Sequence, residues 1–154
     1  MVRLFARVKR EQRRLDVLVN DVWGGDALVQ WGVPFWKLDM KKAKTMLRRA
    51  VWSHTLTSRH GVPLMLEREA GLIVEITDGD FLGWRGNPHF AESETPWYVG
   101  RAVAALAADP NVRAKSGKVF GSWTLAREYG FTDRDGRRPD WGSHMKGEPG
   151  LAGT

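Results

Sequence analysis

The sequence has 154 residues, of which 42% are hydrophobic, and a net charge of +6. This length is typical of one folded domain with a real core, and the composition excludes a wholly disordered chain. The absence of cysteine excludes disulfides and cysteine-based zinc sites, and a reducing cytoplasm is the expected location. No apolar run approaches the length of about 20 residues that a membrane span requires, so no membrane partner is expected.

The basic excess is concentrated near the N-terminus. Its residues are Arg3, Arg7, Lys9, Arg10, Arg13 and Arg14. Residues 2–14 have the pattern of a basic helix, and the simplest interpretation is a solvated helix face. A nucleic-acid surface is the alternative, but no nucleic-acid-binding motif accompanies the charge. Nucleic acid is therefore not the expected partner.

The next segments predict a strand, a loop and a long helix. A short valine-rich run at residues 15–20 lacks alternation, which is typical of a strand buried on both faces of a parallel sheet. Residues 26–38 are irregular and rich in tryptophan, with Pro34 among them, and predict a loop. Asp39 is the predicted N-cap of a helix from Met40 to about Leu66. Pro63 is expected to kink the last turns of that helix or to end it earlier.

The second half of the chain continues the alternation of strand and helix. Residues 72–76 predict another buried strand, with Glu75 as its one charged residue. Thr95 and Pro96 predict the N-cap and first position of a helix that ends at Asp109. Residues 118–122 predict a third strand.

This order of elements predicts an α/β fold. About three parallel strands with flanking helices are expected, in a single domain of residues 1–140. Residues 141–154 are polar and rich in glycine, and we expect them to form a flexible C-terminal tail.

Several segments, in their order and spacing, carry a resemblance to a known family. Asn20-Asp21-Val22-Trp23-Gly24-Gly25 after the first strand is similar to an Asn-Asn-Ala-Gly motif. Residues 58–65 resemble the end of a central helix, and residues 71–77 resemble the strand that carries a catalytic serine. Residues 98–107 are similar to a penultimate helix. The chain thus resembles the short-chain dehydrogenases/reductases. Residues 125–133 resemble the tail of its subgroup related to dehydrogenase/reductase family member one.

The resemblance implies a remnant of a Rossmann-type, doubly wound parallel sheet. It also implies an NAD(P)-dependent oxidoreductase acting on a small carbonyl or alcohol substrate. By position, Asn20, Asp21 and Gly24 would bind the adenine side of the cofactor, although closure of a tight turn is the simpler interpretation. Thr77, or less well Asp78, would stand at the position of the catalytic serine, although a strand-end turn residue looks the same.

The sequence departs from the family pattern at its catalytic centre. The family places a lysine four residues after its acid/base tyrosine, so that the two share a helix face. Here Ala102 follows Tyr98 at that spacing, and Asp133 follows Tyr129. The resemblance therefore implies an N-terminally truncated, internally deleted member that lacks the Tyr-x-x-x-Lys helix and the Gly-rich cofactor loop. We expect it to be inactive and to bind little or no NAD(P).

The remaining motifs do not indicate a phosphate-binding or metal-binding site. Gly79, Gly83 and Gly86 do not have the spacing of a phosphate-binding loop. The four histidines lack metal-site spacing, so no metal is predicted. A non-catalytic interaction or oligomerisation module, and less favourably a basic nucleic-acid binder, remain as alternative functions. A homo-oligomer is possible because a small sheet leaves strand edges unpaired.

Overall fold

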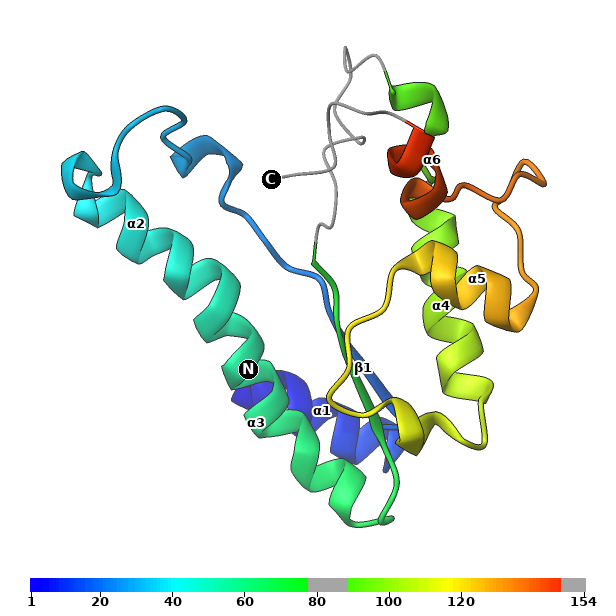
Figure 1. Ribbon diagram of the computed structural model, residues 1–154. Helices are drawn as coiled ribbons and strands as arrows, with labels where there is room; N and C mark the ends of the chain where they lie inside the picture. Colours follow the sequence, from blue (N-terminus) through cyan, green and yellow to red (C-terminus); the bar gives the residue numbers. More distant parts are fainter. Residues whose placement is uncertain (78–88, 148–154) are drawn as a thin grey trace. The chain divides into compact units, whose positions relative to one another are not determined.

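The computed structural model describes residues 1–77 and 89–147 (Figure 1). The chain divides into two compact units, residues 1–77 and residues 78–154, which we describe separately. The elements of the first unit are α1 (Val2–Gln12), β1 (Val17–Asn20), the 3-10 turns η1 (Asp26–Leu28) and η2 (Phe35–Lys37), α2 (Met40–Leu47), the π-helical turn η3 (Arg48–Trp52), α3 (Ser53–Leu66) and β2 (Leu72–Glu75).

The sheet of the first unit is a parallel pair. β1 lies beside β2, with Val17 opposite Leu72 and Asn20 opposite Glu75. The predicted α/β class and the parallel pairing of these two strands are confirmed. Within the described residues the sheet has two strands, because the third predicted strand does not form.

Residues 118–122 were expected to form that strand, and the prediction was wrong. This stretch follows the 3-10 turn η5 (Val112–Lys115) and Gly117, whose φ is +72°. Ser122 already begins the next helix, α5 (Ser122–Tyr129). The side chain of Val119 is 91% exposed, so it contributes nothing to a core. A strand needs a neighbouring strand and a buried face, and the described structure provides neither here.

The long helix begins where the sequence indicates. Asp39 caps it by accepting hydrogen bonds from the backbone N–H groups of Lys41 (2.8 Å) and Lys42 (3.3 Å). α2, η3 and α3 then follow one another without a gap to Leu66. The alternative in which the helix ends before Pro63 is wrong, because α3 continues through this proline. Burial of Leu64 and Met65 stabilises the final turn and offsets the missing backbone donor.

The core of the first unit lies between α1, α3 and β1. Gly61 of α3 allows close approach, since a Cβ there would lie 3.1–3.2 Å from atoms of Leu15, Leu18 and Phe5. Successive strand side chains alternate between faces, so Val19 points away from Leu18, and it is 43% exposed. Burial of both strand faces, as the valine-rich run indicated, is therefore not observed.

The second unit is mainly helical. Its elements are η4 (Phe90–Glu92), α4 (Pro96–Ala108), η5 (Val112–Lys115), α5 (Ser122–Tyr129) and α6 (Trp141–Gly147). Tyr98, Ala102 and Leu106 of α4 are buried, as are Leu125 and Ala126 of α5. α4 begins at Pro96 with Thr95 as its N-cap, as the sequence indicates.

A buried carboxylate ties the start of α4 to the loop after α5. Asp133 accepts hydrogen bonds from the backbone N–H of Thr95 (2.8 Å) and from its hydroxyl (2.6 Å). It also accepts one from the N–H of Arg134 (2.6 Å). These hydrogen bonds hold the pKa of Asp133 below its usual value, although burial alone would raise it.

Residues expected to form a flexible tail begin with a helix. Asp140 starts α6, because its carboxylate accepts a hydrogen bond from the N–H of Ser143 (2.9 Å) and its carbonyl accepts one from His144 (3.0 Å). In residues 1–77 and 89–147, no helix is both long and apolar enough to cross a bilayer.

Candidate functional site

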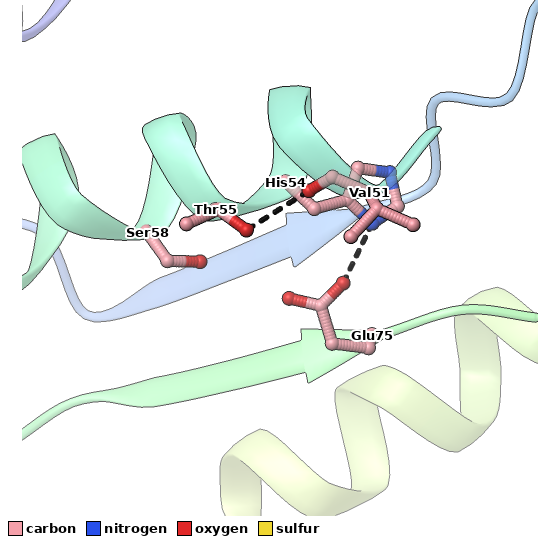
Figure 2. Close-up of a pocket in the computed structure, with 5 residues that line it drawn as sticks. All are labelled: Val51, His54, Thr55, Ser58 and Glu75. Atoms are coloured by element: carbon pink, nitrogen blue, oxygen red, sulfur yellow. Dashed lines mark hydrogen bonds and ion pairs between the residues drawn. The ribbon is translucent and has the colours of Figure 1, made fainter. Parts of the chain in front are cut away.

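The candidate site lies where the two parallel strands end. The carboxyl ends of parallel strands share one edge of a sheet, and α/β proteins bind ligands along that edge. Here the pairing places Asn20 and Glu75 side by side as the last residues of β1 and β2. A pocket of about 450 Å³ opens beside them, lined by Val51, His54, Thr55, Ser58 and Glu75 (Figure 2).

Helix α3 contributes the polar side chains above the strand ends. His54 and Ser58 are four residues apart, so they lie on the same helix face. Asn20, which is 3% exposed, donates hydrogen bonds from its amide to Ser58 Oγ (3.0 Å) and to Glu75 Oε1 (2.5 Å). The Asn20 side chain therefore connects α3 to β2.

The imidazole of His54 completes this network. Its Nδ1 lies 2.7 Å from Glu75 Oε2 (Figure 2). Its Nε2 lies 2.9 Å from the carbonyl oxygen of Val22. Both partners are oxygen acceptors, and a neutral imidazole has only one N–H. The two hydrogen bonds form together only when the ring is protonated, and the ring then also pairs electrostatically with the Glu75 carboxylate.

This arrangement supports binding more readily than nucleophilic chemistry. A serine nucleophile needs a base whose free nitrogen faces its hydroxyl. Both nitrogens of His54 are engaged elsewhere, and Ser58 Oγ accepts a hydrogen bond from the amide of Asn20. Glu75 is about half exposed, so the pocket presents a carboxylate to a ligand.

The residues predicted to bind cofactor are only partly brought together. Asn20 lies in the network, but its amide is occupied within the chain. Asp21 and Gly24 lie on the exposed turn that follows. Gly24 has φ +61°, a conformation that glycine adopts without strain, and its carbonyl accepts a hydrogen bond from Arg49 (2.7 Å).

Thr77 lies at the same edge of the sheet but outside the pocket lining. It follows Ile76, whose N–H donates to the carbonyl of Asn20 (2.9 Å), and its side chain is exposed. The alternative residue Asp78, the glycines 79, 83 and 86, and the region of Asn87 and Pro88 lie outside the described residues.

Sequence reasoning did not assign His54, Ser58 and Glu75 to a site. One signal was present, because Glu75 interrupts an otherwise apolar strand. A charged residue in such a strand needs a partner, and His54 is that partner.

Two curated proteins are similar to this chain. No protein-family model matches it. Dehydrogenase/reductase SDR family member 1 of Mus musculus is 28% identical over 197 residues, which cover 87% of this chain and 63% of that protein. The protein of the same name from Homo sapiens matches with the same identity and coverage.

The chain is a relative of the short-chain dehydrogenases/reductases. The resemblance drawn from the sequence is therefore confirmed at the level of a family relative. The chain spans 63% of the length of the curated relatives. Their matched stretch of 197 residues is longer than the 154 residues of this chain, so within that stretch the relatives contain residues that this chain lacks.

The acid/base residue of the short-chain dehydrogenases/reductases is a tyrosine, so the surroundings of the two tyrosines of this chain matter. Both belong to the second unit. Tyr98 is 1% exposed, and its hydroxyl donates to the carbonyl of Pro139 (3.1 Å). Burial raises the pKa of Tyr98, and the nearby carboxylates of Glu94, Asp140 and Asp133 raise it further.

The hydroxyl of Tyr129, like that of Tyr98, donates a hydrogen bond to an oxygen atom of the chain. Its hydroxyl donates to Asp109 Oδ2 (2.5 Å). Lys115 lies 5.4 Å from the centre of its ring, but the ammonium group also pairs with Glu128 at 2.6 Å. Burial and the hydrogen bond to Asp109 raise the pKa of Tyr129 despite this lysine.

The described residues at the strand edge do not fit a nicotinamide dinucleotide. The pyrophosphate of such a cofactor is negatively charged and favours backbone N–H groups at a helix N-terminus. The pocket instead presents the Glu75 carboxylate, and its one basic lining residue, His54, is engaged with that carboxylate. In residues 1–77 and 89–147, no group of three or more histidine, aspartate or glutamate side chains could hold a metal ion.

Proposed function

We propose that this chain derives from an NAD(P)-dependent oxidoreductase and does not itself catalyse hydride transfer. The parent reaction would move a hydride between nicotinamide and a small carbonyl or alcohol substrate. The names of the curated relatives support the descent. Because the chain depends on no disulfide, we propose the cytoplasm as its location.

One observation carries the proposal of inactivity. The sequence contains two tyrosines, and both hydroxyls donate to oxygen atoms within the chain. The environment raises the pKa of each phenol, whereas efficient acid/base catalysis needs a pKa near the operating pH. Each phenol therefore holds its proton more tightly than a free tyrosine does.

Weak or absent cofactor binding is part of the same proposal. Glu75 would oppose a pyrophosphate at the strand edge, and the Asn20 amide is occupied by Ser58 and Glu75. We also propose that the residues present only in the relatives belong near Asn87 and Pro88, where the active-site helix of the family would stand.

The direct test measures turnover and cofactor binding by the purified chain. NADH and NADPH are each offered with a panel of aldehydes and ketones, and oxidation of the nicotinamide is followed by absorbance. The mouse relative serves as a control for assay conditions. We expect no turnover above the rate without protein, and no saturable change of nicotinamide fluorescence.

Two variants make this test informative. If the chain does turn over a carbonyl compound and Tyr98→Phe or Tyr129→Phe abolishes the activity, the proposal is wrong and the acid is identified. A separate titration follows phenolate absorbance with pH. We expect both tyrosines to ionise above the free value of about 10, and ionisation of either near neutral pH would contradict the proposal.

A homo-oligomer is a second candidate, supported by the sheet. In the described part of the chain β1 and β2 pair only with each other, so each presents one edge of unpaired backbone groups. Such edges favour pairing with another strand. Light scattering over a range of concentrations tests this candidate, and a constant monomer mass would refute it.

A further inference from the structure

The first unit exposes a group of large apolar side chains that its core does not use. They lie in the loop before α2 and along α2 and η3 (Figure 1). Their exposed fractions range from 62% to 77%, and the residues are Trp31, Phe35, Trp36, Met40, Leu47 and Val51. Monomeric soluble proteins rarely expose contiguous apolar surface of this kind, and it marks sites of interaction.

The helical part of this surface has a regular pattern. Met40, Leu47 and Val51 recur at intervals of seven and four residues, which places them along one stripe of the helix. Phe35 and Trp36 precede that stripe in the loop, with their rings 5.3 Å apart and nearly perpendicular. The two rings therefore come directly before the helix that carries the stripe.

Basic side chains accompany the apolar ones. Between residues 37 and 49 the chain carries one acidic residue, Asp39, and six basic ones. The basic residues are Lys37, Lys41, Lys42, Lys44, Arg48 and Arg49. All six are exposed. Helical spacing brings Lys41, Lys44 and Arg48 nearest to the apolar stripe, and we name the apolar residues together with these three the aromatic–basic surface.

We propose that the aromatic–basic surface docks the chain on an anionic lipid bilayer. Tryptophan and phenylalanine bury their rings at the boundary between headgroups and acyl chains, where aliphatic side chains are also accommodated. Lysine and arginine beside them attract anionic headgroups, and each strengthens binding about fivefold near a charged membrane. Sequence analysis expected no membrane partner because it considered only spanning segments, and docking requires none.

Charge distinguishes this occupant from a second copy of the chain. Two copies meeting through the same surface would bring Lys41, Lys44 and Arg48 of one chain against those of the other. Like charges in an interface are unfavourable. A nucleic acid would satisfy the charges and stack on Trp36, but it offers little to the aliphatic side chains of Met40, Leu47 and Val51.

A second pocket of the first unit, on another face of the same helix, is lined by side chains that fit a phosphate headgroup. It has a volume of about 400 Å³, and its lining includes Thr45, Arg48, Arg49, Trp52 and Leu56. Guanidinium groups bind phosphate oxygens in a bidentate way, while Trp52 and Leu56 supply apolar wall. The pocket therefore combines the two chemistries of an anionic lipid at one place.

Vesicle flotation tests the proposal with the full chain. The vesicles contain phosphatidylcholine alone, or phosphatidylcholine and phosphatidylserine in equal parts. We expect the chain to float with the anionic vesicles and to bind neutral ones at least about tenfold more weakly. Raising the salt concentration to about 0.5 M should release most of the bound protein, because screening shortens electrostatic reach.

Two variants separate the apolar and the basic contributions. Phe35→Ser with Trp36→Ser should weaken partitioning into anionic vesicles at least about tenfold, since both rings lose their burial in lipid. Lys41→Gln with Lys44→Gln and Arg48→Gln should weaken it by about a hundredfold. The matched controls Trp97→Ser and Arg113→Gln remove an exposed indole and an exposed guanidinium of the second unit, and each should leave partitioning unchanged.

Circular dichroism and urea titration check that every variant folds. Failure of the wild-type chain to bind anionic vesicles overturns the proposal. Binding of both surface variants to these vesicles as tightly as the wild-type chain would also overturn it. Self-association that the Phe35→Ser/Trp36→Ser variant abolishes, without vesicle binding, would assign the surface to a second copy instead. Binding of a single-stranded RNA without vesicle binding would likewise overturn the membrane assignment.

Discussion

His54 of α3 and Glu75 of β2 form a hydrogen-bonded pair, with Nδ1 2.7 Å from Oε2. The side chain of His54 is 20% exposed and that of Glu75 is 54% exposed. The pair joins the helix to the carboxyl end of the sheet, 21 residues apart in the chain. The coupling energy of this pair can be compared with that of a pair in the same unit whose basic residue is more exposed.

A double-mutant cycle of His54→Ala and Glu75→Ala should give a coupling energy of about 0.5–1 kcal/mol. The matched cycle uses Lys9 and Glu67, whose Nζ and Oε1 lie 2.5 Å apart at a more exposed position. Solvent screening should hold that coupling to about 0.2–0.5 kcal/mol. Free energies of unfolding from urea titration supply both values, and equal coupling in the two cycles would contradict the partial burial of His54.

Asn20→Ala should destabilise the first unit by about 1–2 kcal/mol, because the buried amide donates two hydrogen bonds that alanine cannot replace. Asn20→Asp should cost more, since it places a second carboxylate beside Glu75. Asp21→Ala changes the exposed neighbour and should alter stability by no more than about 0.5 kcal/mol. Equal losses for Asn20→Ala and Asp21→Ala would show that the network contributes nothing to stability.

Substitution by alanine at two helical glycines should change the free energy of unfolding in opposite directions. At Gly61 the new methyl group would lie 3.1–3.2 Å from three side chains of α1, the following turn and β1, so overpacking should cost about 1–2 kcal/mol. At Gly100 of α4 it would meet no described atom within 4 Å. There the higher helix propensity of alanine should stabilise by up to about 1 kcal/mol. Urea titration reports both effects, and a stabilising Gly61→Ala would refute the close packing.

Asp133 should make the free energy of unfolding depend on pH in the acid range. Hydrogen bonds lower its folded-state pKa, so its contribution is fully present above the unfolded value of about 3.9. The contribution is then lost as the pH falls through the lower folded value. Stability of the wild-type chain should therefore decline more steeply in acid than that of Asp133→Asn, which carries no charge to protonate. Parallel acid profiles for the two proteins would contradict this assignment.

Much of the local structure could be read from the residues alone. Asp39 and Thr95 mark two helix starts because short polar side chains accept hydrogen bonds from the first backbone N–H groups, and both act as caps in the structure. The two short apolar runs predict β1 and β2, whose pairing is parallel. These features depend on a few neighbouring residues, so the pattern is sufficient to find them.

Residues 118–122 show where local pattern fails. The run has strand propensity, but a strand forms only where another strand supplies hydrogen-bond partners. The described structure supplies none, and Ser122 enters α5 instead. Local pattern misses the site for the same reason. Asn20, Glu75 and the helical pair His54 and Ser58 come from three segments that are distant in sequence and converge only through folding.

The sequence by itself determined the helix starts, the two apolar strands and the family resemblance. It also determined that no lysine lies four residues after either tyrosine. All of these are properties of neighbouring or regularly spaced residues. Only the tertiary structure decided that Asn20 is occupied by Ser58 and Glu75, and that Trp36 and Leu47 are exposed. Burial and hydrogen-bond partnership depend on which distant segments meet, and that is decided by packing of the whole unit.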